Sequence, residues 1–195
     1  MAINLTKGQR VTLDRKMRLA LVGLGWDENE GSGFDFDLDA SAFLLGVNGR
    51  VPSDDDFVFY GNQEHYSGAV RSTGDDTSGG NSDGGDDEQL IIDFDKMPAN
   101  VQRIAICVTI YDAEKRRQNF GQVRNAYVRV CKMANENDQD GEEILRYYLD
   151  EDFSTETAIV VCEIYLRDGE WKFNALGQGY SGELAGLCRK YGVNV

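Results

Sequence analysis

Aspartate and glutamate residues are concentrated in two segments of this 195-residue chain, and carboxylates at such spacing can bind a metal cation. The first segment is FDFDLDASAFLL (residues 34–45), in which Asp35, Asp37 and Asp39 alternate with apolar residues. This alternation predicts a half-buried β-strand, on which residues two apart point to the same face. Three negative charges in a row repel one another. We therefore expect a positive partner for them.

The second segment is a glycine-rich acidic loop, STGDDTSGGNSDGGDDE (residues 72–88), which contains no Lys or Arg. Its acids are Asp75, Asp76, Asp83, Asp86, Asp87 and Glu88. The composition is also that of a disordered loop, but long structureless loops inside a compact domain are uncommon and often functional. Glycine lets the backbone turn tightly and present carbonyl oxygens. A solvated acidic face is the alternative for both segments, although spread-out acids would serve solubility better.

Calcium is the cation that these groups suit best, because it takes about 6–8 oxygen ligands. Transition metals favour His and Cys, which the two segments lack, and magnesium would suit fewer carboxylates and more water. Three carboxylates on one face predict two ions that share the middle ligand, and Asp27 could close the site. An EF-hand loop starting at Asp35 would need Gly and Glu where the chain has Ala40 and Gly46. A composite site is therefore predicted, made of the strand and the distant loop.

Other classes of function find less support in the sequence. A formal net charge of −14 argues against a nucleic-acid surface and against direct adhesion to an anionic membrane. GQGYSG (177–182) matches a dinucleotide-binding glycine pattern, but only 13 residues follow Gly182, so a turn and a helix start are the better interpretation. His65, the one histidine, is expected to be an ordinary exposed loop residue.

Two further sets of residues are of types that can take part in chemistry, the cysteines and a group of basic residues. The cysteines are far apart and without metal-ligand spacing, and they are expected to be buried, reduced thiols: Cys107, Cys131, Cys162 and Cys188. The basic residues between 115 and 129 are expected to form a solvated face or, alternatively, a site for an anionic partner: Lys115, Arg116, Arg117, Arg124 and Arg129.

The elements that must position the acids are mainly strands. Strand-like runs occur at 18–24, 36–46, 56–61, 89–94, 103–111, 125–132, 143–150, 158–167 and 170–177. Asp-Gly in LRDGEW predicts a hairpin turn, and VNGRV carries the Asn-Gly form. The spacing predicts an antiparallel β-sandwich of two sheets with a few short helices. One helix is expected at the C-terminus, with Ser181 as its N-cap and Gly192 as its stop, and a helical turn around 114–124.

The length permits one domain with a sizeable core, and no linker or internal repeat divides the chain, so a single domain over residues 1–195 is predicted. No run of 18 apolar residues is present, and the polar N-terminal segment has no apolar core typical of a signal peptide. A cytoplasmic location is therefore expected.

The chain resembles the TerD family of tellurite-resistance and general stress proteins over nearly its whole length. The motifs that carry the resemblance are LVGLGWD (21–27), FDFDLDASAFLL (34–45), PSDDDFVFYGN (52–62), GDD with GGDDE (74–76, 84–88), AEKRRQNFGQVRNAYVRV (113–130), DFSTETAIVVCEIYLRDGEWKF (152–173) and GQGYSGELAGLCRKYGV (177–193).

The resemblance implies a β-sandwich that binds calcium and acts in resistance to tellurite and other chemical stress. It implies protein partners among other tellurite-resistance proteins, in a membrane-associated complex. The sequence shows no catalytic set, so a protein without enzymatic activity is expected. The ligand candidates are Asp27, Asp35, Asp37, Asp39, Asp75, Asp76, Asp83, Asp86, Asp87 and Glu88. The alternatives are a calcium-dependent membrane adaptor and an enzyme that handles an oxyanion.

Overall fold

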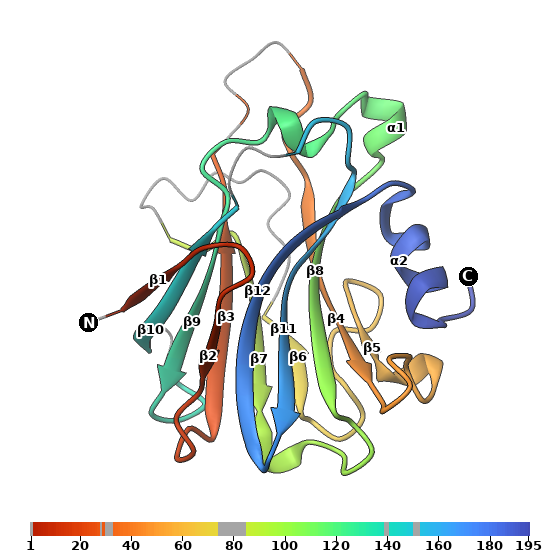
Figure 1. Cartoon of the computed structure of the whole chain (residues 1–195). Helices are drawn as coiled ribbons and strands as arrows, with labels where there is room; N and C mark the ends of the chain where they lie inside the picture. Colours follow the sequence, from red (N-terminus) through yellow and green to blue (C-terminus); the bar gives the residue numbers. More distant parts are fainter. Residues whose placement is uncertain (1, 28, 30–32, 74–84, 139–140, 150–152) are drawn as a thin grey trace.

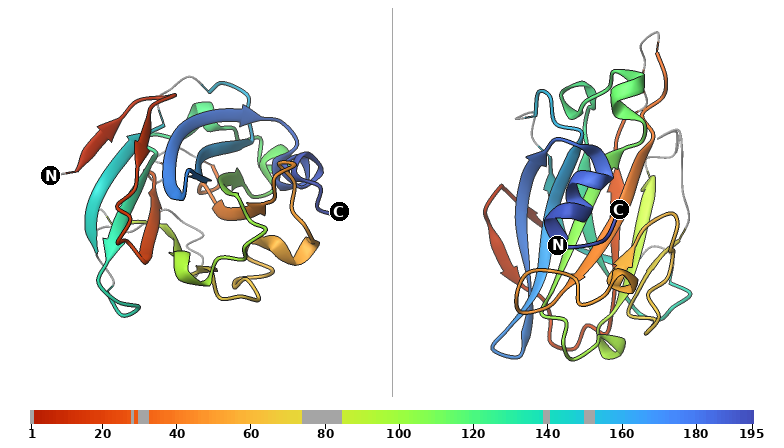
Figure 2. Two further views of the ribbon diagram at one scale, coloured as in Figure 1. Left: turned by 60° about the horizontal axis from the view of Figure 1, so that its bottom comes forward. Right: turned by 90° about the vertical axis from the view of Figure 1, so that its right-hand side faces the viewer.

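Two β-sheets pack face to face in the computed structural model, which describes residues 2–27, 29, 33–73, 85–138, 141–149 and 153–195 (Figures 1 and 2). Over these residues the first sheet has the order β1 (Ile3–Leu5), β10 (Glu142–Tyr148), β9 (Tyr127–Met133), β3 (Leu19–Gly25), β7 (Glu88–Asp93) and β6 (Val70–Ser72). The second has the order β2 (Arg10–Thr12), β12 (Glu170–Tyr180), β11 (Ala158–Arg167), β8 (Arg103–Ile110), β4 (Leu38–Leu45) and β5 (Phe57–Val58).

The predicted mainly-β sandwich is confirmed, with one departure from antiparallel pairing. β1 runs parallel to β10 at an edge of the first sheet. The short strands β1, β2 and β6 have three residues each and were not predicted, because three residues are too few to display a period of two. Neighbouring strands, rather than their own sequences, bring these segments into the sheets.

The main core lies between the sheets. On β3 the side chains of Ala20, Val22 and Leu24 face it, and on β4 the even-numbered residues from Leu38 to Leu44 do the same. The odd-numbered residues of β4 point to the other side of their sheet, where Phe43 and Leu45 belong to a second apolar cluster. β4 is buried on both faces because that second cluster is also covered.

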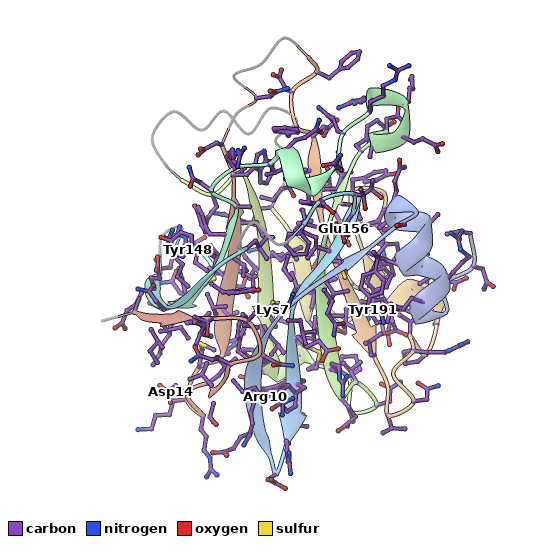
Figure 3. The ribbon with its side chains drawn as sticks, turned by 45° about the horizontal axis from the view of Figure 1, so that its top comes forward. Lys7, Arg10, Asp14, Tyr148, Glu156 and Tyr191 are labelled. Carbon is purple, nitrogen blue, oxygen red and sulfur yellow. The ribbon has the colours of Figure 1, made fainter. Side chains whose placement is uncertain are left out.

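Helix α2 (Glu183–Tyr191) covers this outer face of the second sheet (Figure 2, right). Its Tyr191, labelled in Figure 3, packs on Phe43 with ring centroids 4.7 Å apart. The predicted stop at Gly192 is confirmed (φ 85°), but the N-cap is Gly182 rather than Ser181. Gly182 has φ 93°, a left-handed conformation that glycine adopts without strain.

The turns and short helices occur at the predicted places, although the Asn-Gly pair does not form a two-residue hairpin. Asp168 and Gly169 both have positive φ and join β11 to β12, as a tight Asp-Gly hairpin requires. The Asn-Gly pair at 48–49 lies inside a longer connection from β4 to β5, which also holds the 3-10 helix η1 (Asp54–Asp56). The helical turn expected around 114–124 is present as α1 (Ala113–Arg116) and the 3-10 helix η3 (Phe120–Gln122), and a third 3-10 helix, η2, spans Phe94–Lys96.

Among the described residues, no helix combines the length and apolar character that crossing a membrane would need.

Candidate metal centre

The first acidic segment and the described residues 85–88 of the second lie at the same end of the sandwich, the upper end in Figure 1, which also carries α1. β3 ends there while β7 begins, since Leu24 is paired with Glu88. β4 begins there while β8 ends, since Leu38 is paired with Ile110. β4 and β7 also contact each other across the core. The fold therefore brings the ends of both acidic segments to one region.

The first acidic segment enters its strand later than predicted. β4 begins at Leu38, not at Phe36, so Asp35 and Asp37 precede the strand and the expectation of three aspartates on one strand face is wrong. The reason lies in the partner strand. The amide of Tyr111 donates to the carbonyl of Asp37 (2.8 Å), and the chain then turns at Asp112 (φ 51°) into α1, leaving no strand to pair with Asp35.

Asp37 and Asp39 have different surroundings, although both are buried. Arg116 of α1 donates to a carboxylate oxygen of Asp37 (3.1 Å). Asp39 begins the outward-facing series of β4 and lines a cavity of about 500 Å³ beside α2. Two residues of separation thus place one aspartate beside an arginine and the next in a cavity.

Asp27 and Asp35 are exposed, and both lie close to the chain between α1 and β9. A carboxylate oxygen of Asp27 accepts from the side-chain amide of Asn125 (2.6 Å). The carbonyl oxygen of Asp35 accepts from Nε2 of Gln118 (3.2 Å), which also donates to the carbonyl of Phe34 (2.7 Å). The other amide atom, Oε1 of Gln118, is buried without a hydrogen-bond partner. A buried amide oxygen without a partner is the type of donor that calcium takes.

In the second acidic segment, the carboxylate of Asp86 accepts hydrogen bonds from three side chains. Asp86 accepts from Nε and Nη2 of Arg129 (2.7 and 2.9 Å), from the Tyr127 hydroxyl (3.1 Å) and from Gln89 (3.0 Å). Its side chain has no exposed surface and lies over Gly23, where any Cβ would overlap the carboxylate. Charge-assisted, two-pronged hydrogen bonds of this kind are the strong ones.

The neighbours of this carboxylate respond to it electrostatically. The hydrogen bond to Asp86 raises the pKa of Arg129 further above its ordinary value. Burial raises the pKa of the Tyr127 hydroxyl to about 12, and the negative charge of Asp86 adds to the shift. The guanidinium of Arg129 therefore keeps its positive charge beside the buried carboxylate.

Asp87 and Glu88 complete the described part of the loop. Oδ2 of Asp87 accepts from the amide of Trp26 (2.9 Å), while its own amide donates to the carbonyl of Leu24 (2.8 Å). Glu88 is 4% exposed and shares a strand face with Leu90, which lies in the main core. The carboxylate of Glu88 is thus directed between the sheets, whereas that of Asp86 lies on the outer face.

The structure brings the two halves of the predicted site to one end of the fold without joining them in its described part. Asp75, Asp76 and Asp83 lie outside the described residues. Across the described ranges, no three His, Cys, Asp or Glu side chains form a group that could hold a metal ion. The donor set nevertheless suits calcium, because it consists of carboxylate and amide oxygens. Burying ionised carboxylates is costly unless they are paired or bind a metal.

Two of the basic residues predicted to form a solvated face or an anion site instead pair with carboxylates of the acidic segments. Arg116 and Arg129 neutralise Asp37 and Asp86. These pairings connect α1 and β9 to the acidic segments. The sequence did not predict these ion pairs. The contact of Arg129 depends on the register of β9 against β3, which the spacing of the arginines does not report.

His65 is a second correction, since it is buried (1% exposed) rather than an exposed loop residue. Its Nε2 contacts Asp56 (2.9 Å), and its Nδ1 contacts the Ser67 hydroxyl (2.8 Å) and accepts from the Ser67 amide (3.2 Å). Because Nδ1 accepts from an amide, the proton sits on Nε2 and faces Asp56. The contact fastens the 60–69 segment to η1. Asp56 is also bonded by the amide of Ser53 (2.9 Å), so a fixed structural role fits it best.

The cysteines agree with the prediction. All four are buried and free. Burial raises the pKa of the Cys107 and Cys162 thiols well above the ordinary value, which makes them poor nucleophiles.

Comparison with known proteins agrees with the fold and the motifs. Residues 1–191 match the TerD domain family. The chain is 49% identical to a tellurium resistance protein TerD of Serratia marcescens, covering 100% of this chain and 99% of that protein. It is 46% identical to general stress protein 16U of Bacillus subtilis (strain 168), over 100% of both. The solved structure of SAV2460, a protein of unknown function, superposes with a TM-score of 0.72 at 20% identity, covering 92% of this chain and 99% of that one.

Proposed function

The chain belongs to the TerD family of tellurium resistance and general stress proteins, and from that membership we propose that it is a non-enzymatic calcium-binding protein of the stress response. We propose further that it acts through protein partners, by analogy with the resistance proteins to which it is similar. The names of these relatives support the role in stress, and the chemistry of the acidic end supports the metal.

The observation that carries the calcium proposal is the number of carboxylates buried at one end of the sandwich. Asp37, Asp39, Asp86, Asp87 and Glu88 are each less than 10% exposed. Arg129 neutralises Asp86 and Arg116 neutralises Asp37. Burying ionised carboxylates this close together is costly, and a divalent cation would offset part of that cost.

We assign the role of ligands to Asp37, Asp39, Asp87 and Glu88, together with the predicted residues Asp27, Asp35, Asp75, Asp76 and Asp83. The amide oxygen of Gln118 is an added candidate, because it is buried and has no partner. When bound, calcium would supply positive charge and a link between the starts of β4 and β7. Asp86 then serves as a support rather than a ligand, since Arg129 already holds both of its oxygens.

Thermal unfolding with and without calcium tests the proposal. A ligand that binds only the folded state stabilises it by about 2.7 kcal/mol at a hundredfold excess over its Kd, which for a domain of this size is about 5–10 °C in Tm. We expect calcium to produce such a shift and magnesium a much smaller one. Glu88→Gln and Asp37→Asn should each remove most of the shift. Asp168→Asn, in the exposed hairpin turn, is the matched control and should keep it.

The proposal is contradicted if calorimetry detects no calcium binding at millimolar concentration. It is also contradicted in its ligand assignment if Glu88→Gln and Asp37→Asn keep the full calcium-dependent shift. Asp86→Asn tests whether Asp86 supports the fold without being a calcium ligand. It should lower the Tm of the calcium-free protein while leaving the additional shift produced by calcium largely intact.

A further inference from the structure

A second cavity of about 500 Å³ lies beside α1, at the upper end of the sandwich in Figure 1. Residues that precede β4 line it on one side, and residues between α1 and β9 line it on the other. Its volume falls within the range of small-molecule sites, about 300–1,000 Å³. We name it the arginine cavity after Arg116, Arg117 and Arg124, which line it.

The charge of this lining is opposite in sign to that of the chain. None of the described residues that line the arginine cavity is Asp or Glu, although the formal net charge is −14. Arg116 donates one hydrogen bond to Asp37, but a guanidinium has five N–H donors, so it can bind a further acceptor. Arg117 is exposed, and no described carboxylate forms an ion pair with it. Arg117 therefore offers an unpaired positive charge to an anion.

The backbone of Arg117 is also unusual. Arg117 ends α1 with φ 54°, and its amide donates to the carbonyls of Ala113 and Glu114. Glycine or asparagine usually takes such a left-handed position at the end of a helix. An arginine there costs stability, and residues that carry such a cost are often found at binding sites. Because glycine would relieve the strain, a substitution at this position can separate binding from stability.

An exposed aromatic ring lies at the same cavity. Phe34 lines it and is 66% exposed, and the guanidinium of Arg116 lies 5.7 Å from the centroid of its ring. Aromatic side chains beside arginines are the surfaces on which nucleic-acid bases stack, since every base has a π-face. The exposed ring of Phe34 can therefore accept a planar group of a ligand.

A buried amide supplies the third feature of the arginine cavity. Gln118 lines the cavity and is 7% exposed, and its Nε2 donates to the carbonyls of Phe34 and Asp35. Its Oε1 is buried without a hydrogen-bond partner, which is rare and costly. An N–H donor on a ligand would provide that partner. Because the same oxygen is a candidate calcium ligand, binding of such a ligand must be tested without calcium.

We propose that the arginine cavity binds a nucleoside monophosphate whose base carries an exocyclic amine, such as adenosine monophosphate. The phosphate pairs with Arg117 and with the remaining donors of Arg116, since guanidinium groups match the geometry of phosphate. The base stacks on Phe34, and its amine donates to Oε1 of Gln118. Inorganic phosphate would use the arginines alone, and a nucleoside would use only the ring and the amide. This inference goes beyond the calcium proposal and does not depend on it.

Calorimetric titration of the full chain with adenosine monophosphate in EDTA tests the proposal, and NMR locates the bound ligand. We expect saturable binding, with chemical-shift changes at Phe34, Gly121 and Gln122, which line the cavity. Adenosine and inorganic phosphate should each bind at least about tenfold more weakly, because each lacks a charged or a stacking contact. Purine riboside monophosphate, which lacks the amine, should also bind about tenfold more weakly, because Oε1 of Gln118 then has no donor.

Arg117→Gly is the first variant. It should weaken binding of adenosine monophosphate about tenfold or more, since hydrogen bonds to charged groups are the stronger ones. Its Tm should not fall, because glycine adopts the left-handed conformation without strain. Lys115→Ala is the matched control, because Lys115 lies on the same helix, has a side chain that is 81% exposed and does not line the cavity. Its affinity should stay within about twofold of the unaltered protein, since a distant exposed charge is screened.

Phe34→Ala is the second variant, chosen because an exposed ring can be removed without unfolding the protein. It should weaken binding about fivefold or more, as expected for loss of one stacking contact with a base. Tyr66→Ala is its control, because Tyr66 is 70% exposed and does not line the cavity. That variant should bind as the unaltered protein does.

Several results would overturn the inference. No saturable binding of adenosine monophosphate at millimolar concentration would remove the site. Equal affinity for adenosine would show that the phosphate contributes nothing, and equal affinity for inorganic phosphate would show an anion site that does not recognise the base. Equal losses in Arg117→Gly and Lys115→Ala would reduce the effect to general attraction between charges. Binding in EDTA that is weakened only in the cavity variants supports the proposal, whatever the outcome for the calcium site.

Discussion

Asp86 and Asp39 come from the two acidic segments, and both are buried at the same end of the sandwich, but their surroundings are opposite. Asp86 is enclosed by Arg129, Tyr127 and Gln89, with its side chain fully covered. Asp39 faces a cavity lined by three further carboxylates. Arg129 pairs with the first carboxylate on the outer face of the first sheet, whereas the second carboxylate lines a cavity on the outer face of the second sheet. Composition alone therefore does not show how the surroundings of two buried acids differ; the contacts made by distant segments do.

The largest loss of stability is predicted for removal of Arg129, the partner of Asp86. Arg129→Ala leaves Asp86 buried without its cation, which typically costs about 3–5 kcal/mol in the free energy of unfolding. We expect a loss of that size in urea denaturation. The double variant Asp86→Ala/Arg129→Ala should lose less than the sum of the two single variants, because neither charge is left alone.

Strict additivity in that double-mutant cycle would contradict the pairing. Arg15→Ala is a suitable control, since Arg15 pairs with Glu170 at the surface and is 72% exposed. Its loss should be at most about 1 kcal/mol, the usual value of an exposed ion pair.

A smaller effect is expected from the glycine beneath the same carboxylate. A Cβ at Gly23 would overlap Asp86, so Gly23→Ala must push the aspartate away from Arg129. Forced overpacking of this kind costs about 1–3 kcal/mol. Urea denaturation measures it, and Gly46→Ala is the control, because a Cβ there would meet no atom closer than 3.6 Å. Equal stability of the two variants would show that the Asp86 contact shifts without cost.

The sequence predicted the sheets better than the acids. Runs such as AIVVCEIYLR give a strand whose bounds, 158–167, agree with the structure, because ten alternating or apolar residues leave little ambiguity. The Asp-Gly turn and the stop at Gly192 follow from φ angles that few residues adopt. The start of β4 could not be predicted, since it depends on where β8 turns away at Asp112.

The burial of single polar residues could not be predicted from the sequence either. His65 is covered because Asp56 lies nine positions earlier on another turn and bonds it. The separation of Asp37 from Asp39 depends on α1 carrying Arg116 to one and on α2 forming the wall beside the other. These are contacts between distant segments, which alternation along one strand does not report.

The smallest predicted effect concerns Glu143, the weaker partner of Arg129. Arg129 is 2.7 Å from Asp86 but 3.6 Å from Glu143, whose closer partner is Arg146 (2.7 Å). The hydrogen bond from Arg146 holds the pKa of Glu143 below its ordinary 4.5, although partial burial opposes the shift.

A carboxylate with a lowered folded pKa stabilises the protein above its unfolded pKa, and this contribution disappears as the pH falls through the folded value. Glu143→Gln should therefore cost about 0.5–1 kcal/mol at pH 7, and this cost should shrink as the pH falls below 4.5 and through the folded pKa of Glu143. Urea denaturation across that range measures the difference, with Glu142→Gln on the same strand as the control. If Glu143→Gln were as costly at pH 7 as Arg129→Ala, the arginine would owe its importance to Glu143, and the contrast between Asp86 and Asp39 would lose its physical basis.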